Sequence, residues 1–179
     1  GRAFWRTRVL LTMVELDLFA KISEGPRSAD ELVSDMAADP RAIQVLLDAA
    51  TGQGWLDKSE DRYRLASPMR AYLSPDGDQC VLPMLEHMAK LWHDWTRLSD
   101  IVAPRTQPAW RHDHGRTRSF IGAMHVVSKG RAPELVRAVG ARGERSLLDV
   151  GGASGTFTMA FLRELPDMQA TLFDLPDVV

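Results

Sequence analysis

The chain has few of the features that mark specialised classes of protein. Its single cysteine, Cys80, cannot form a disulfide within the chain, which is consistent with a reducing compartment. The formal net charge is only −2, an ordinary value for a globular protein. No apolar run approaches the roughly 18 residues that span a bilayer, and residues 1–8 lack the apolar core of a signal peptide. We therefore expect a cytoplasmic protein with no membrane partner.

A glycine-rich turn is the most informative feature that the chain does have. Residues 146–155 read SLLDVGGASG. Leu147, Leu148 and Val150 predict a strand that is buried on both faces. The glycines after it would let the backbone turn sharply and approach a ligand without intervening side chains; they are Gly151, Gly152 and Gly155.

A helix and a second strand are predicted to follow this turn. The helix covers roughly residues 156–165 and ends at Pro166. Residues 170–173 form the second strand, which places Asp174 at its carboxyl end. Ligands bind at the carboxyl ends of the strands in open parallel sheets. The sequence thus predicts a nucleotide-type binding site between Gly151 and Asp174.

The turn fits a nicotinamide dinucleotide poorly, because it reads G-G-A-S-G rather than G-x-G-x-x-G. Asp149 adds negative charge beside it, which suits an amino group or a sulfonium cation better than a pyrophosphate. The segments LLDVGGASG and FDLPDVV resemble the first two cofactor motifs of the class I S-adenosylmethionine-dependent methyltransferases. They are most similar to the small-molecule O-methyltransferases of the plant caffeate type and their bacterial relatives, whose sequences contain DVGGGxG followed by FDLP.

This resemblance implies S-adenosyl-L-methionine as the cofactor. The backbone at Gly151, Gly152 and Gly155 would approach its methionine portion, Asp149 would favour its positive charge, and Asp174 would accept two hydrogen bonds from its ribose hydroxyls. The reaction implied is methyl transfer from a sulfonium to an oxygen nucleophile, in which the protein supplies alignment and removes a proton.

A helix predicted at about residues 117–128 carries Phe120, Met124 and Ser128 on one stripe. From their spacing alone, Phe120 and Met124 could simply be core residues. The segment is similar to the family pattern F-x-x-x-M-x-x-x-S, which implies that Phe120 and Met124 line the acceptor pocket and that Ser128 binds the cofactor. For His125, on the neighbouring stripe, both acid–base work and a packed or solvated position remain open.

The N-terminal region predicts helices followed by a two-stranded wing. Residues 4–22 carry an apolar stripe that predicts one long amphipathic helix. Ser28 and Glu31 predict a capping box, and Asp39 followed by Pro40 predicts the start of another helix. Strands at residues 55–58 and 63–65 complete a winged helix.

Winged helices frequently bind DNA, but this one lacks the necessary excess of basic side chains. Its candidate recognition helix carries the basic Arg41 and the polar Gln44 but also the acidic Asp48, and its wing contains both acidic and basic residues. We therefore expect no nucleic-acid partner. The same winged helix opens the small-molecule O-methyltransferases, which implies a homodimer through this domain and a small-molecule acceptor.

The turn-rich segment 74–78 is the best candidate for a domain boundary. We predict a mostly α winged-helix dimerisation domain over residues 1–78 and connecting helices over residues 79–118. Residues 119–179 would be the beginning of an α/β Rossmann-like methyltransferase domain that binds S-adenosylmethionine.

Two histidine-containing segments are not expected to be sites. His93-Asp94-Trp95 is similar to the catalytic HDW sequence of the family, but the family's copy follows the cofactor motifs, whereas this one precedes them. In addition, Trp95 is expected to point inward with Leu85, Met88 and Trp92, and His93 does not share that face of the helix. His93 is therefore not assigned as the base. The other segment contains His112, Asp113 and His114 and is predicted to be an exposed loop. No further metal ligands lie near it in the sequence, so we expect no metal site there.

Two strands and one crossover helix cannot bury both faces of a parallel sheet. We therefore expect this chain to be a methyltransferase fragment with little turnover of its own, whose base lies beyond Val179 and which could be accompanied by the remainder of the domain. Three functions remain open. They are O-methylation of a phenolic or polyketide-like molecule, C- or N-methylation or other chemistry with the same cofactor, and a non-catalytic dimerisation or regulatory module.

Overall fold

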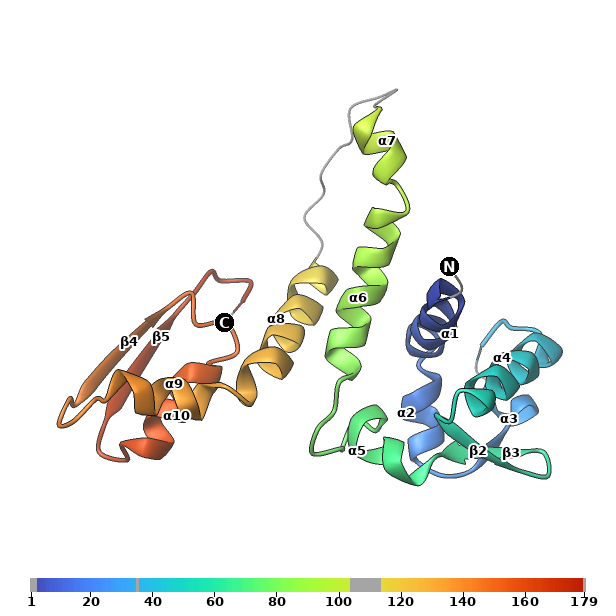
Figure 1. The fold of residues 1–179 in the computed structure, drawn as a ribbon, viewed down its shortest axis with the longest axis horizontal. Helices are drawn as coiled ribbons and strands as arrows, with labels where there is room; N and C mark the ends of the chain where they lie inside the picture. The colour runs from blue at the N-terminus through green and yellow to red at the C-terminus, as the bar shows by residue number, and fades with distance from the viewer. Residues whose placement is uncertain (1–2, 35, 104–113, 179) are drawn as a thin grey trace. The chain divides into compact units, whose positions relative to one another are not determined.

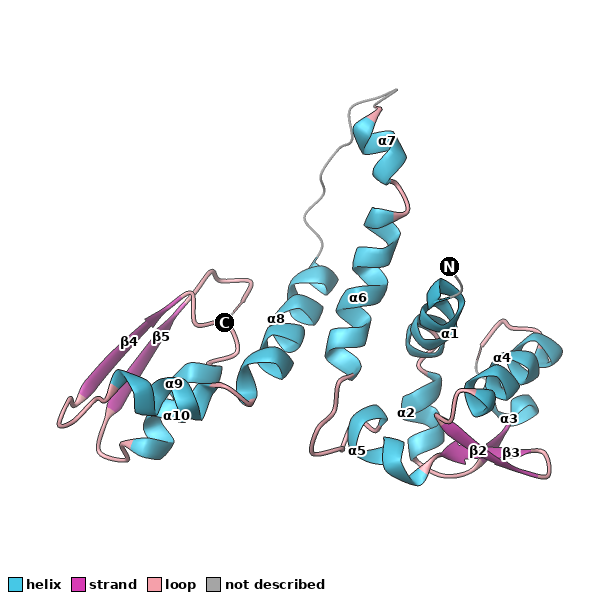
Figure 2. Ribbon diagram, in the orientation of Figure 1, coloured by secondary structure: helices cyan, strands magenta, loops and turns pink. Residues whose placement is uncertain are grey.

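The computed structural model describes residues 3–34, 36–103 and 114–178 (Figure 1). The chain divides into two compact units, unit 1 (Gly1–Thr96) and unit 2 (Arg97–Val179). Helices predominate in both units, and the described strands form one small sheet in each (Figure 2).

Unit 1 begins with two helices where the sequence predicts one. Helix α1 (Ala3–Glu15) and helix α2 (Leu18–Ser23) are separated at Asp17, whose φ of 55° lies in the left-handed region. A residue in that region cannot continue a right-handed helix. The prediction of one continuous helix over residues 4–22 is therefore wrong. Its apolar stripe is nevertheless buried, through Leu11, Met13, Leu18, Phe19 and Ile22.

Helix α3 (Ala29–Val33) begins with the predicted capping box. The Ser28 hydroxyl accepts a hydrogen bond from the Glu31 backbone N–H at 3.2 Å, and the Glu31 carboxylate accepts one from the Ser28 N–H at 3.1 Å. Two backbone donors that the helix leaves unpaired are thereby satisfied.

Helix α4 (Pro40–Gly52) also begins where the sequence indicates. The Asp39 carboxylate accepts a hydrogen bond from the Arg41 N–H at 3.0 Å, and Pro40 occupies the first turn. Its apolar face is buried at Ile43 and Leu47.

An antiparallel hairpin follows α4, as predicted. Strands β2 (Leu56–Ser59) and β3 (Arg62–Leu65) pair with each other, and β1 (Arg27–Ser28) adds to the free side of β3, so the order is β1-β3-β2. The sequence does not predict β1, because two residues are too few to show an alternating pattern. Tyr63, on β3, is only 1% exposed and faces the core.

Three more helical segments complete unit 1, namely η1 (Ser67–Met69), α5 (Arg70–Leu73) and α6 (Leu82–Trp95). Helix α6 packs against α1. It buries Leu82 and Ala89, whereas Trp95 is 67% exposed. The prediction that Trp95 points inward is wrong within this chain, because the inward face of α6 is the one that carries Leu82 and Ala89.

The core of unit 1 is one cluster that draws on α1 to α6, β2 and β3. Its buried members are Met13, Leu18, Phe19, Ile22, Leu32, Ile43, Leu47, Ala50, Trp55, Leu56, Tyr63, Leu65, Leu73 and Leu82.

Unit 2 contains the predicted strand–helix–strand order. Its elements are α7 (Leu98–Val102), α8 (His114–Lys129), α9 (Ala132–Val139), β4 (Ser146–Val150), α10 (Thr156–Glu164) and β5 (Gln169–Phe173). Strands β4 and β5 are parallel, with Val150 opposite Phe173 at their carboxyl ends. The parallel pair joined by a crossover helix is confirmed.

The sheet of unit 2 is covered on one face only. Thr158 of α10 donates a hydrogen bond to Asp149 of β4, so α10 lies on the face that carries Asp149. On the other face, Leu148, Val150 and Phe173 are 64%, 68% and 63% exposed. Burial of this strand on both faces, which the sequence predicts, is therefore not provided by the described residues. The expectation that these elements cannot cover both faces is confirmed.

Candidate functional site

The turn between β4 and α10 uses backbone conformations that favour glycine. Gly151 has a φ of 74° and Gly155 a φ of 67°. The Gly151 N–H donates to the Phe173 carbonyl at 2.7 Å, which extends the pairing of the two strands into the turn, and the Gly155 N–H donates to the Gly152 carbonyl at 2.8 Å. The glycines of the motif thus form a tight turn at the carboxyl end of β4.

This turn is closely packed at one glycine and open at another. A Cβ added at Gly152 would lie 2.8 Å from Cγ of Asp149 and 2.8 Å from Cγ of Leu172, so a larger residue does not fit there. A Cβ added at Gly151 would meet nothing within 4 Å. The space beside Gly151 would therefore let a ligand approach the backbone of the turn.

Asp174 connects the end of β5 to the turn after β4. Its Oδ2 accepts a hydrogen bond from the Ala153 N–H at 2.8 Å, and its Oδ1 accepts one from the Leu175 N–H at 2.7 Å. Each oxygen of an ionised carboxylate has two lone pairs, so both can still accept a bond from a ligand hydroxyl. Ala153 itself has a φ of 46°, an unusual value for a residue with a Cβ.

Asp149 lies between β4, α10 and the turn. Its Oδ2 accepts a hydrogen bond of 2.5 Å from the Thr158 hydroxyl, and Thr158 is only 8% exposed. The sequence does not predict this partner, because a threonine within a helix carries no marker of its role. Asp149 therefore anchors α10 to β4 next to Gly152.

Helix α8 reaches the turn through His125. The Nδ1 atom of His125 is 2.8 Å from Oγ1 of Thr156, which in turn is 2.8 Å from Oγ of Ser154. These three side chains form a continuous row, which we call the His125–Thr156–Ser154 row. From the sequence the role of His125 stays open and no role is predicted for Ser154 or Thr156, although a hydroxyl residue on each side of Gly155 is a pattern that can indicate one.

The residues of α8 that the sequence assigns to the pocket and the cofactor are more exposed than Ala123 on the same helix. Phe120 is 48% exposed, and Met124 and Ser128 are half-buried, whereas Ser119 and Ala123 are 4% and 0% exposed. The two most buried residues of α8 therefore each precede by one position a residue of the stripe that the sequence pattern indicates, Phe120 and Met124. Pocket and cofactor roles for Phe120, Met124 and Ser128 stay predictions.

Unit 1 has a polar cluster of its own, at Asp48, Lys58 and Tyr63. The Lys58 ammonium and the Tyr63 hydroxyl donate to the same oxygen of Asp48, at 2.7 and 2.8 Å. The hydrogen bond from Lys58 lowers the pKa of Asp48 and raises the pKa of Lys58, and burial raises the pKa of Tyr63. Each shift keeps the group in the charge state it already has at neutral pH, so the cluster ties the hairpin to α4 and offers no reactive group.

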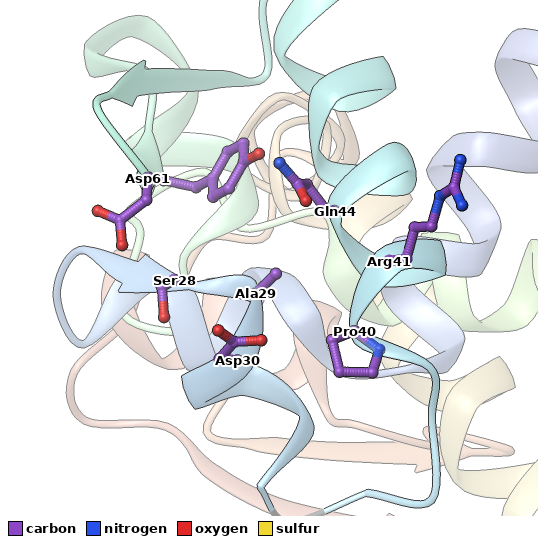
Figure 3. A pocket seen from close by; sticks show the side chains of 8 residues that line it. Ser28, Ala29, Asp30, Pro40, Arg41, Gln44 and Asp61 are labelled. Carbon is purple, nitrogen blue, oxygen red and sulfur yellow. The ribbon is translucent and has the colours of Figure 1, made fainter.

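A hollow of about 180 Å³ lies beside this cluster, between α3, α4 and β3 (Figure 3). Figure 3 shows Asp61 and Arg41 at opposite ends of its lining, with Gln44 between them. The Tyr63 hydroxyl is directed to Asp48. Because the polar groups do not converge on one point, this hollow does not form a catalytic or metal-binding arrangement.

Two further observations concern the described part of the chain only. It contains no group of three or more His, Cys, Asp or Glu side chains that could hold a metal ion. None of its helices is both long enough and apolar enough to cross a membrane. His112 and Asp113 lie outside the described residues, and His93 is exposed on α6.

Comparison with known families agrees with this geometry. The model of the O-methyltransferase dimerisation domain matches residues 2–75, and that of the O-methyltransferase domain matches residues 95–179.

Individual relatives match nearly all of the chain. The tetracenomycin polyketide synthesis 8-O-methyl transferase of Streptomyces glaucescens is 30% identical over 98% of this chain and 55% of its own length. The 3-hydroxy-5-methyl-1-naphthoate 3-O-methyltransferase of Streptomyces sahachiroi is 28% identical over 97% and 53%. Human N-acetylserotonin methyltransferase, solved in complex with S-adenosylmethionine, superposes with a TM-score of 0.76 at 22% identity, over 99% of this chain and 58% of that one.

The chain spans about half the length of these relatives. Within that half, both matched domains occur in the same order as the two units. The chain therefore belongs to the O-methyltransferases, with one segment matched to their dimerisation domain and one to their methyltransferase domain.

Proposed function

We propose that the chain is part of an S-adenosylmethionine-dependent enzyme that methylates a hydroxyl group of a phenolic or polyketide-like molecule. The observation that carries this proposal is the position of Asp174. Its carboxylate is bonded to the glycine turn at Ala153, next to the open space at Gly151. An acceptor of hydrogen bonds thus stands beside a backbone that a ligand can approach, at the carboxyl ends of two parallel strands.

The residues present fit the cofactor. Gly151, Gly152 and Gly155 would face its methionine portion, Asp149 would favour its positive charge, and Asp174 would accept bonds from the ribose hydroxyls. When bound, S-adenosylmethionine supplies a methyl group activated by a sulfonium. The chain's own part is to orient the cofactor and, through α8, to help exclude water from the transfer.

The acceptor is proposed from α8 and from the relatives. Phe120 and Met124 would line its pocket, and Ser128 would contact the cofactor. Two matched relatives are named as O-methyltransferases, one acting on a hydroxynaphthoate and one in polyketide synthesis. An N,N-dimethyltransferase of Streptomyces rimosus also matches at 27% identity, so nitrogen is the second candidate for the methylated atom. No catalytic base is assigned.

We propose that unit 1 is a winged helix used for dimerisation. Exposed apolar side chains on α1 and α6 support an interface between copies; they are Phe4, Trp5, Met88, Leu91 and Trp95. Binding to nucleic acid is disfavoured, because the basic residues of the hairpin are already in ion pairs. These pairs are Lys58–Asp48, Arg62–Glu31 and Arg64–Asp57.

The domain limits also remain a proposal, with dimerisation over residues 1–78, connecting helices over 79–118 and cofactor binding over 119–179. Light scattering on the chain tests the dimer. A monomer at micromolar concentration would contradict the interface on α1 and α6.

Binding of S-adenosylhomocysteine to the full-length protein tests the cofactor site. Replacing Asp174 by Asn removes one acceptor oxygen and turns a donor toward the backbone, so we expect the Kd to rise at least about tenfold in calorimetry. The matched control is Asp167→Asn, because Asp167 is exposed and precedes β5 at the opposite end of the strand.

Each outcome is decisive. An Asp174→Asn protein with unchanged affinity would remove Asp174 from the site. A wild-type dimer that ignores S-adenosylhomocysteine would instead favour the third function, a non-catalytic dimerisation or regulatory module.

A further inference from the structure

We propose that the His125–Thr156–Ser154 row is a positioning device that fixes the glycine turn against α8 and so sets the affinity for the cofactor. This inference rests on the proposed function, because it assigns a role to residues around the same turn. It adds three residues to which the sequence motifs give no role in binding.

The hydrogen-bond geometry makes the row directional. A threonine hydroxyl has one proton, so Thr156 can donate to only one of its two neighbours. If Nδ1 of His125 carries no proton, Thr156 must donate to it and Ser154 must donate to Thr156. In that state of the imidazole, the Ser154 hydroxyl is held with its proton directed at Thr156. Both contacts are 2.8 Å long, the distance of a well-formed bond.

The turn needs such support because of its backbone. Ser154 lies between Ala153 and Gly155, which have φ values of 46° and 67°. A left-handed residue with a Cβ persists only where its surroundings hold it in place. Gly155 precedes α10 as its N-cap and provides no side-chain hydrogen bond to the helix. Thr156, only 8% exposed, is the first residue after it and supplies the attachment to α8.

The row also joins two parts of the proposed site. His125 directly follows Met124 and lies three residues before Ser128, both on α8. Ala123 is fully buried, and α8 contacts α10. If the row is broken, the turn and α8 can shift relative to each other, and a ligand that contacts both must order them when it binds. Affinity for the cofactor should fall even where the fold persists.

The test compares two replacements of His125 that differ in where they place a polar atom. Asparagine puts one near the position of Nδ1, whereas glutamine puts one near Nε2. Because the contact to Thr156 is made by Nδ1, His125→Asn should keep the row and His125→Gln should break it. Thr156→Val removes the hydroxyl and nearly preserves the shape of the side chain.

The measurement is the Kd of S-adenosylhomocysteine for the full-length protein by calorimetry. We expect His125→Gln and Thr156→Val each to raise the Kd about tenfold, and His125→Asn to stay within about threefold of the wild type. The double variant His125→Gln/Thr156→Val should bind no more weakly than either single variant, because both remove the same row.

A second readout reports on the row without any ligand. In nitrogen NMR of the histidine rings, Thr156→Val should shift the Nδ1 resonance of His125, and Asp167→Asn should not. Unchanged affinity in His125→Gln and Thr156→Val would overturn the proposal, and so would equal losses in His125→Gln and His125→Asn. A wild-type protein that binds no S-adenosylhomocysteine would overturn the proposed function instead, whatever the NMR spectra show.

Discussion

The two units hold their shapes by different means. Unit 1 surrounds a large apolar cluster that includes Leu47 and Tyr63, each at most 1% exposed. The buried cluster of unit 2 consists of Ala132, Val136 and Ala160, and its turn is held by backbone conformation and by polar contacts from Asp149, Asp174 and His125. The candidate site thus lies in the unit with less apolar burial. Binding regions commonly lie in the less stable part of a protein, because that part can move slightly when a ligand binds.

The largest expected effect separates two leucines, one from each unit. Leu47→Ala removes a side chain with 0% exposure and should lower the free energy of unfolding of unit 1 by about 2–5 kcal/mol. Leu148→Ala changes a residue that is 64% exposed and should alter stability by no more than about 0.5 kcal/mol. Denaturant titration followed by hydrogen exchange in peptides of each unit measures both. Equal losses at the two positions would refute the contrast between the units.

A smaller effect is expected at the turn. Gly152→Ala places a Cβ 2.8 Å from Asp149 and Leu172, so the turn must shift, at a cost of about 1–3 kcal/mol. We expect at least about tenfold weaker binding of S-adenosylhomocysteine. The control is Gly130→Ala, since a Cβ at Gly130 would meet nothing within 4 Å. If calorimetry gives both variants the wild-type Kd, close packing at Gly152 does not shape the site.

The smallest effect concerns the polar cluster of unit 1 and depends on pH. The pKa of Asp48 is lowered by its bond to Lys58, so its contribution to stability is present above the ordinary pKa of 3.8 and is lost as the pH falls through the lowered value. The pKa values of Lys58 and Tyr63 are raised, so their contributions are present at lower pH and are lost as the pH rises through the raised values.

Asp48→Asn should therefore destabilise unit 1 most between these limits, and its difference from the wild type should shrink in acid and in alkali. Urea midpoints across the pH range measure this difference. Asp57→Asn is the control, because Asp57 lies 3.4 Å from Arg64 in a more exposed pair and should change the midpoint less. A difference that is constant with pH would rule out the ion pair as its cause.

Local signals predicted most of unit 1. Three features occur as expected: the capping box at Ser28, the start of α4 at Asp39 and Pro40, and the hairpin of β2 and β3. Each depends on residues that are close together in the sequence. The fold of unit 2 around the motif was equally accessible, because the glycines and Asp174 mark the ends of the parallel strands.

What the sequence could not provide were contacts between distant segments. His125 and Thr156 are 31 positions apart, and no periodicity links them. Likewise, the outward position of Trp95 follows from the packing of α6 on α1, which depends on the whole of unit 1. The exposed face of β4 shows a related limit of prediction from sequence. Its apolar residues are suited to burial, but residue type does not show whether another helix or strand covers them.

Asp17 has a consequence for how unit 1 responds to changes at the outer end of α1. Because its left-handed backbone ends α1, one apolar stripe serves two separate neighbours: α1 packs against α6, and α2 packs against β3 and α5. The outer end of α1 carries the exposed Phe4 and Trp5. Replacing these two side chains would therefore leave in place the residues that the inner end of α1 and α2 contribute to the core.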